Sequence, residues 1–271
     1  MRIITLRRLL SAAAIVALAS VTLVAQAGRK VFIIQTNAAG DNSHVIDPTT
    51  NKVVATIEGT EVPHGVAPAP DGKRVYITNE SKRQLEVIDP KTWKIIKSIP
   101  LSGRPNNVFV SKDNRKVYVG IAQAPGAVDV IDATAMTNVK SVKVDGSVHN
   151  VYVTPDGKYA VSGSVATGVI SVIDTKTDEV AWSYKETSGI RPMIFETNPD
   201  GSTRNIYVQL SDYHGIAVVD FATHKETKRW ELPAVPGQEK ELEGLQGAPA
   251  HGFAVTPDQK VLLATSKWYG A

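Results

Sequence analysis

The sequence contains no cysteine. It therefore has no disulfide, no thiolate nucleophile and no C-x-x-C-H site for covalent haem. The motifs G-x-S-x-G and H-E-x-x-H are also absent, so no local motif indicates a serine hydrolase or a zinc protease. Without covalent cross-links, the fold must depend on a large core or a closed architecture.

The chain has no excess of positive charge once residues 1–27 are left out of the count. Residues 1–27 hold three arginines, an apolar run over residues 9–24 and then Ala25-Gln26-Ala27, a pattern that predicts a signal peptide cleaved after Ala27. The apolar run is shorter than the roughly 20 residues of a membrane span, so we expect no span after cleavage. Cleavage removes three of the 30 basic residues and none of the 27 acidic ones. The neutral remainder argues against nucleic acid as a partner. The signal peptide predicts a periplasmic or secreted protein.

A repeat of about forty residues is the strongest pattern in the chain. Its first anchor is a short apolar strand that ends in Asp, found as Val45-Ile46-Asp47, Val87-Ile88-Asp89, Val130-Ile131-Asp132, Val172-Ile173-Asp174 and Val218-Val219-Asp220. The steps between these aspartates are 42, 43, 42 and 46 residues. A second anchor recurs in phase as a turn at Pro70-Asp71-Gly72, Asp113-Asn114, Pro155-Asp156-Gly157, Pro199-Asp200-Gly201 and Pro257-Asp258-Gln259. Because two anchors share one period, the chain is built from repeated structural units.

Each repeat unit predicts four antiparallel strands. Runs rich in Val, Ile, Thr and Tyr are bounded by Asp, Asn, Gly and Pro, which is typical of strands and hairpins. One unit places its strands at residues 64–70, 74–79, 84–89 and 94–100. The sequence therefore predicts an all-β fold, a β-propeller of four-stranded antiparallel blades.

The repeat resembles a known family. Pro63-His64-Gly65-Val66, the segment 70–79 (PDGKRVYITN) and the segment 87–92 (VIDPKT) are similar to the bacterial YVTN-family β-propeller repeat, also described as YncE-like. The resemblance covers nearly all of residues 28–271 and implies a seven-bladed propeller in an exported protein. It implies no single chemistry, because the family's relatives include haem d1, amine dehydrogenase and lactonase domains.

The number of strands is too small for a closed seven-bladed ring. Residues 31–56 supply three strands, four full repeats follow, and residues 251–265 supply two, which gives 21 strands where 28 are needed. We therefore expect a C-terminally incomplete ring with about five blades. The alternative is an open ring or one closed by a partner.

Candidate site residues gather where the first strand of each repeat begins, beside the central channel of a propeller. The residues predicted to open this strand are His64, Asn106, His149, Met193 and His251. His214, Arg104 and Arg191 are predicted on the same face, and Glu61 is a further candidate for lactonase-like chemistry. The segment 234–249 is a loop longer by 14 residues than its counterparts and carries three glutamates. Loops of this kind on a rigid scaffold are frequent binding sites.

Two functions follow from these residues. The first is a non-catalytic scaffold that presents the histidine-lined channel mouth and the 234–249 loop to a protein, glycan or small-molecule ligand. The second is a metal- or cofactor-assisted enzyme, either lactonase-like or associated with an oxidoreductase, in which His64, His149 and His251 hold copper or zinc. A structural role for these residues, in the turn into the strand, is the third alternative.

Overall fold

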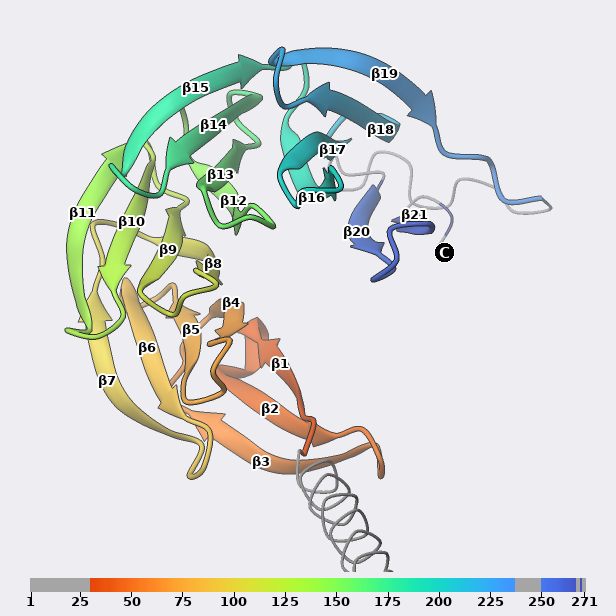
Figure 1. Ribbon diagram of the computed structural model, residues 1–271. Coiled ribbons are helices and arrows are strands. Elements are labelled where there is room, and N and C mark those ends of the chain that lie inside the picture. Colours follow the sequence, from red (N-terminus) through yellow and green to blue (C-terminus); the bar gives the residue numbers. More distant parts are fainter. Residues whose placement is uncertain (1–29, 237–249, 267–268, 270–271) are drawn as a thin grey trace, which may run out of the picture.

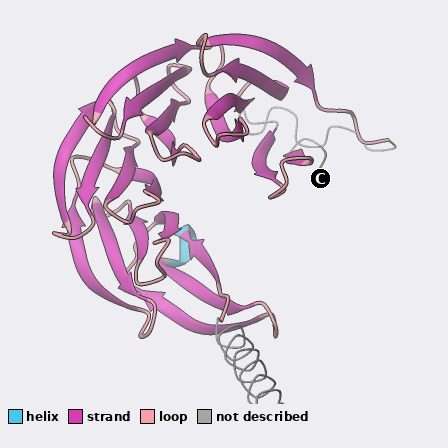
Figure 2. Ribbon diagram, in the orientation of Figure 1, coloured by secondary structure: helices cyan, strands magenta, loops and turns pink. Residues whose placement is uncertain are grey.

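The computed structural model describes residues 30–236, 250–266 and 269, which form an all-β structure (Figures 1 and 2). The segment assigned to a signal peptide and most of the 234–249 loop lie outside these residues. Within the described part the strands are β1 (Ile33–Asn37), β2 (Asn42–Asp47), β3 (Lys52–Glu58), β4 (Pro63–Pro68), β5 (Val75–Asn79), β6 (Gln84–Asp89), β7 (Lys94–Pro100), β8 (Pro105–Val110), β9 (Lys116–Ile121), β10 (Ala127–Asp132), β11 (Thr137–Lys143), β12 (Val148–Val153), β13 (Tyr159–Ser164), β14 (Val169–Asp174), β15 (Glu179–Lys185), β16 (Ile190–Thr197), β17 (Thr203–Leu210), β18 (Tyr213–Asp220), β19 (Lys225–Glu231), β20 (Ala250–Val255) and β21 (Leu262–Ser266). A short 3₁₀ turn, η1 (Ala38–Gly40), follows β1. No helix in the described ranges is long and apolar enough to cross a bilayer.

The strands form antiparallel sheets in sequence order, and each sheet is a blade of the predicted β-propeller. Four blades have four strands: β4–β7, β8–β11, β12–β15 and β16–β19. They are flanked by a three-stranded sheet, β1–β3, and a two-stranded sheet, β20–β21. The structure thus confirms the propeller fold and the four-stranded blade, while the expected total of seven blades stays a prediction.

The blades are set side by side in an arc (Figure 1). The first strand of each complete blade lies on the inner edge with β20, and the last strand lies on the outer edge. Neighbouring inner strands pack against each other, as β4 does with β8 and β8 does with β12. In the described residues the arc is open between the β1–β3 sheet and the β20–β21 sheet.

The core lies between the blades, because the two middle strands of a blade are covered on both faces. All five residues of β5 are buried, and so are four of the six residues in β6. One apolar cluster joins Tyr76 and Leu85 of one blade to Val119 and Ile131 of the next. This double burial explains why the middle strands are nearly continuous runs of Val, Ile and Tyr rather than alternating patterns.

A buried carboxylate ties together the blade β8–β11. Asp129 in β10 is fully buried. It accepts hydrogen bonds from the backbone N–H of Ser102 at 2.7 Å and from the hydroxyls of Ser102 and Ser141 at 2.7 and 2.6 Å. The amide of Asn138 donates a further bond at 2.9 Å. Four donors compensate for the loss of water around the carboxylate.

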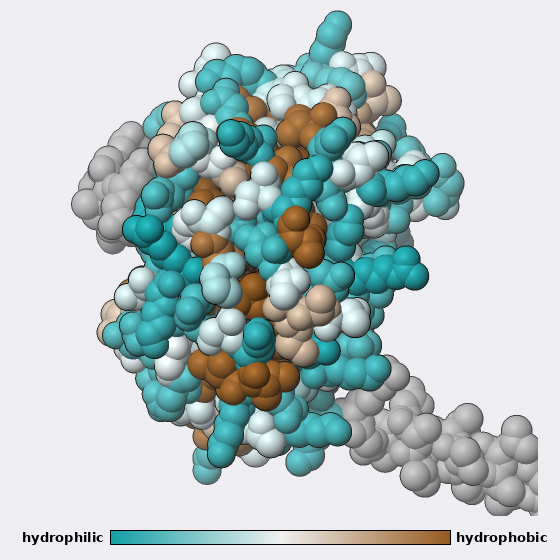
Figure 3. Space-filling view, turned by 90° about the vertical axis from the view of Figure 1, so that its left-hand side faces the viewer, coloured by the Kyte–Doolittle hydropathy of each residue, from teal (hydrophilic) through white to brown (hydrophobic). Residues whose placement is uncertain are grey.

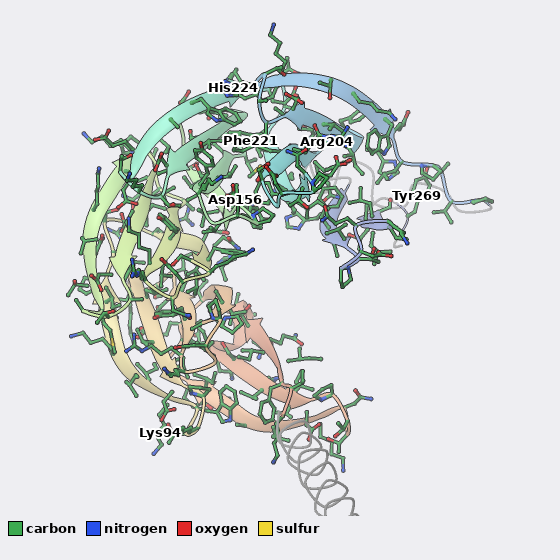
Figure 4. The ribbon with its side chains drawn as sticks, in the orientation of Figure 1. Lys94, Asp156, Arg204, Phe221, His224 and Tyr269 are labelled. Carbon is green, nitrogen blue, oxygen red and sulfur yellow. The ribbon has the colours of Figure 1, made fainter. Side chains whose placement is uncertain are left out.

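A repeated contact, here called the interblade clasp, joins adjacent blades at the end away from the start of the inner strands. The residue that opens or just precedes the second strand of one blade reaches the turn between the third and fourth strands of the next. Its members are Phe32 with Trp93 (ring centroids 5.4 Å), Arg74 with the carbonyl of Ala133, Lys116 with the carbonyl of Thr175 (2.7 Å) and the carboxylate of Asp178 (2.6 Å), and Tyr159 with Phe221 (5.3 Å). In Figure 4, Phe221 lies with His224 at the boundary between β12–β15 and β16–β19, where His224 stacks on Trp182 at 4.1 Å. The interblade clasp thus recurs at the same place in the fold, while the contact itself is aromatic at some blade boundaries and a hydrogen bond or ion pair at others.

Each outer strand carries a β-bulge at the same position. The extra residues are Val54, Ile96, Val139, Ala181 and Thr227, deduced from the register shift against the neighbouring strand. All five are exposed. Figure 3 looks onto this outer edge, where apolar groups are separated by hydrophilic ones.

Replacing the buried carboxylate tests the role of this hydrogen-bond centre. We expect Asp129→Asn to lower the free energy of unfolding by about 3 kcal/mol, because an amide nitrogen replaces an acceptor among four buried donors. Ser141→Ala removes one donor and should cost about 1 kcal/mol. Denaturant unfolding of the full chain, followed by tryptophan fluorescence, measures both, and equal losses in the two variants would contradict this assignment.

Candidate functional site

Every inner strand has a β-bulge near its start, and this bulge builds the candidate site. The pairing of β4 with β5 shifts between Pro63 and Val66, and the same shift recurs in β8, β12, β16 and β20. Each bulge adds one residue to the inner strand, which changes the direction of the side chains around it. The residues at the first position within the five bulges are His64, Asn106, His149, Arg191 and His251.

This register corrects the sequence prediction in one blade. Met193 was expected to open the inner strand, but the register aligns it with Val66 and Val108, not with His64. Met193 is 1% exposed and belongs to the apolar core. The bulge is common to the inner strands, but β16 has eight residues where β4, β8 and β12 have six, and the aligned position is held by Arg191.

One polar group at the site centres on Glu80, which follows β5. Its Oε2 lies 2.6 Å from His64 Nδ1, and its Oε1 accepts a hydrogen bond from Arg104 Nη1 at 2.6 Å. Oε2 has no aligned donor among the described residues, so the contact with His64 is a short polar contact rather than a directed hydrogen bond. Arg104 also donates to the carbonyl of Ala122 at 3.1 Å. The sequence prediction missed Glu80, whose only signal is its place directly after the strand at 74–79.

A second polar group joins three inner strands. The rings of His149 and His251 meet edge to face with centroids 5.7 Å apart. His149 Nδ1 lies 2.6 Å from the side-chain oxygen of Asn150. Arg191 Nε donates to the hydroxyl of Ser211 at 2.8 Å. His64 and Arg191 are both close enough to His149 to act on its charge.

Burial and nearby cations disfavour protonation in this second group. Burial lowers the pKa of His149 below its ordinary 6.5; the bond to Asn150 opposes this, while Arg191, His251 and His64 lower the pKa further. Burial also lowers the pKa of Arg191, which Asp212 partly offsets. At neutral pH the group therefore presents neutral imidazole beside a cationic guanidinium.

Other predicted residues lie elsewhere or have other partners. His214 is 4% exposed and its Nε2 lies 2.8 Å from the hydroxyl of Ser266, so it fills the boundary between β18 and β21 instead of the channel mouth. Glu61 pairs with Lys82 at 2.6 Å. Asn106 is half-buried at its bulge, and its backbone carbonyl accepts a bond from Thr78 Oγ1 at 2.8 Å.

The predicted metal set is not brought together. Within the described ranges, no three His, Cys, Asp or Glu side chains lie close enough to hold a metal ion. His64 is engaged by Glu80, while His149 contacts His251. The donor set thus does not fit copper or zinc bound by the three histidines.

Comparisons with known proteins support the fold. No family profile matches the sequence, and neither does any curated protein. Many solved structures match it in fold. One is the Kuenenia stuttgartiensis hydrazine synthase, with 23% identity, a TM-score of 0.72 and coverage of 87% of this chain and 70% of that chain. At this identity the likeness establishes the β-propeller fold alone, and the resemblance to the YVTN-type repeat stays a prediction.

The histidine pair makes a pH-dependent prediction. We expect the pKa of His149 to lie below 6.5, with Arg191→Gln raising it only partway because burial remains. A lowered pKa means that the unfolded chain binds more protons than the folded chain. The neutral form of His149 therefore contributes to the free energy of unfolding above pH 6.5, and this contribution is lost as the pH falls below 6.5. His149→Gln should therefore reduce the loss of thermal stability between pH 7 and pH 5. NMR titration of the histidine rings and melting curves measure the two effects. Lys97→Gln, on the outer strand β7, is the control, and a His149 pKa at or above 6.5 would refute the prediction.

Proposed function

We propose that this chain is an exported, non-catalytic propeller of the YVTN type that binds a small anionic ligand at the bulges of its inner strands. The observation that carries the proposal is the recurrence of a bulge in all five inner strands, with a polar or basic residue at the same position in each. Bulges are common next to binding sites because they redirect individual side chains. The hydrophobic residue that follows, Val66 in the first and Met193 in the fourth, anchors each strand in the blade.

The chemistry of this face favours a carboxylate. His149, His251 and Arg191 offer hydrogen-bond donors, and burial weakens the cationic forms of His149 and Arg191. A bound anion would favour both cationic forms, so part of its binding energy would come from offsetting their burial. The carboxylate of Glu80 lies against both Arg104 and His64 and would repel an anion there, which directs the ligand toward the His149 side.

Titration with acidic and neutral sugars tests the ligand class. We expect glucuronate and succinate to bind the full chain and raise the pKa of His149, whereas glucose does neither. Arg191→Gln should weaken glucuronate binding at least tenfold, about 1.4 kcal/mol, and Lys97→Gln should leave it unchanged. Calorimetry and the histidine NMR signals give both readouts. Equal binding of glucose and glucuronate, or none of either, would overturn the proposed ligand class.

An enzyme remains the second candidate, and the His64–Glu80 pair favours it. A carboxylate lies 2.6 Å from Nδ1 of this imidazole, and a histidine beside a carboxylate is a common general base in hydrolysis. If this candidate holds, the full chain opens a lactone substrate faster than buffer does and His64→Ala abolishes the difference. If the scaffold proposal holds, the wild-type chain and His64→Ala are equally inactive.

Export is part of the proposal. The three arginines, the apolar run and the A-x-A pattern of residues 1–27 support a cleavable signal, and the neutral remainder suits a protein, glycan or small-molecule partner better than nucleic acid. We expect N-terminal sequencing of the protein from the periplasm or the medium to begin at Gly28. Recovery of the uncleaved chain in the cytoplasm would contradict this localisation.

A further inference from the structure

A basic groove crosses the boundary between the blades β8–β11 and β12–β15, at the end of the blades away from the inner-strand bulges. The groove encloses about 450 Å³ and is lined by four cationic side chains, Lys112, Arg115, Lys116 and Lys176, and by two carboxylates, Asp113 and Asp156. A second hollow, of about 320 Å³, continues from it and shares Arg115 and Lys116. We propose that this groove binds a tetrahedral oxyanion, a phosphate or sulfate group carried by a small molecule. The proposal does not depend on the ligand of the inner face.

Two of the ammonium groups are held across the groove by the neighbouring blade. Lys112 donates to the carbonyl of Pro155, and Lys116 donates to the carbonyl of Thr175 at 2.7 Å and to Asp178 at 2.6 Å. An ammonium group has three N–H donors. The contacts in the described residues use one donor of Lys112 and two of Lys116, so both groups keep donors for a ligand.

Each of the two carboxylates accepts hydrogen bonds within its own turn. Asp113 Oδ1 accepts bonds from the hydroxyl of Ser111 at 2.6 Å and the backbone N–H of Arg115 at 3.0 Å. Asp156 makes the equivalent bonds to Thr154 and Lys158 at 2.7 and 3.1 Å. The bond from the backbone N–H two residues on recurs at Asp71, Asp200 and Asp258, so the acids have a role in closing the turns, which the cations do not share.

The preceding blade boundary provides an internal comparison. The equivalent groove between β4–β7 and β8–β11 encloses only about 220 Å³ and is lined by Asp71, Lys73, Arg74 and Thr134 among others. In the repeat alignment, Pro70 stands at the position of Lys112, and Thr134 stands at the position of Lys176. Lys112 is itself an exception, since the turn has Pro at this place in the other four repeats. The two lysines are therefore not needed to form a groove at this place. They are extra cations of the larger groove, which Asp156 also lines, so that four cations face the three carboxylates Asp113, Asp156 and Asp178.

The shape and charge of the groove suit an oxyanion rather than a planar carboxylate. Lysine ammonium groups act as point charges that contact phosphate and sulfate oxygens from several directions. Lys112 and Lys116 approach from β8–β11, while Lys176 belongs to β12–β15. A tetrahedral group between them would contact both blades at once.

Titration of the full chain with inorganic phosphate, inorganic sulfate and glucose 6-phosphate tests the proposal, with glucose as the neutral control. The NMR signals of the lysine side chains report the site. We expect saturable binding of all three anions, with shifts at Lys112 and Lys176. Lys112→Ala combined with Lys176→Thr should weaken phosphate at least tenfold, and Lys73→Ala in the smaller groove should change it less than twofold. Tighter binding of glucose 6-phosphate than of phosphate would identify an esterified ligand, and equal binding would identify the free anion.

Two results would overturn the proposal: no saturable binding at low ionic strength up to about 10 mM anion, where screening is weakest, or equal weakening by Lys73→Ala and by the double variant. If the double variant is too unstable to measure, Lys176→Thr alone replaces it. This substitution introduces the residue found at the same position of the preceding repeat, Thr134, and should weaken phosphate binding about threefold. Arg191→Gln separates the two sites: it should reduce glucuronate binding at the inner face and leave phosphate binding in the groove unchanged.

Discussion

The burial of each blade on both faces is the constraint on which the rest of this structure depends. A middle strand such as β5, with every residue buried, has no solvent-facing side for polar or functional groups. Chemistry is therefore limited to the ends of the strands, the inner edge and the few buried polar residues that carry their own partners, as Asp129 does. The bulges of the inner strands and the clasps between blades occupy those remaining places.

Most of the fold could be predicted from the sequence, because the period of the repeat and the strand pattern are local properties. The predicted strand at 84–89 is β6, and the predicted strand at 94–100 is β7. The structure likewise has the predicted 21 strands in its described part. These successes rest on turn residues and buried apolar runs, which depend little on the neighbouring blade.

The candidate site was less predictable, because a bulge changes the register by one residue without a sequence signal of its own. The strand β16 is also two residues longer than β4, β8 and β12, and the assignment fell on Met193 in the apolar core instead of Arg191 at the polar edge. His214 failed for a different reason: its burial depends on β21, some fifty residues away along the chain. Glu80 was missed because a single acidic residue after a strand is unremarkable until His64 and Arg104 are seen on either side of it.

The outer bulges have a consequence for how molecules of this protein meet one another. The last strand of each blade leaves a free backbone edge, and such edges invite a strand from another molecule to extend the sheet, which leads to β-augmentation and aggregation. An extra residue at Val54, Ile96 or Val139 interrupts the regular spacing of N–H and C=O groups that an added strand would need. Lysines on β7, such as Lys94 and Lys97, add a charge that would be costly to enclose. Contacts between copies along these outer strands would therefore have to use side-chain surfaces, and the apolar residues exposed at the bulges do not offer a continuous strand for polymerisation.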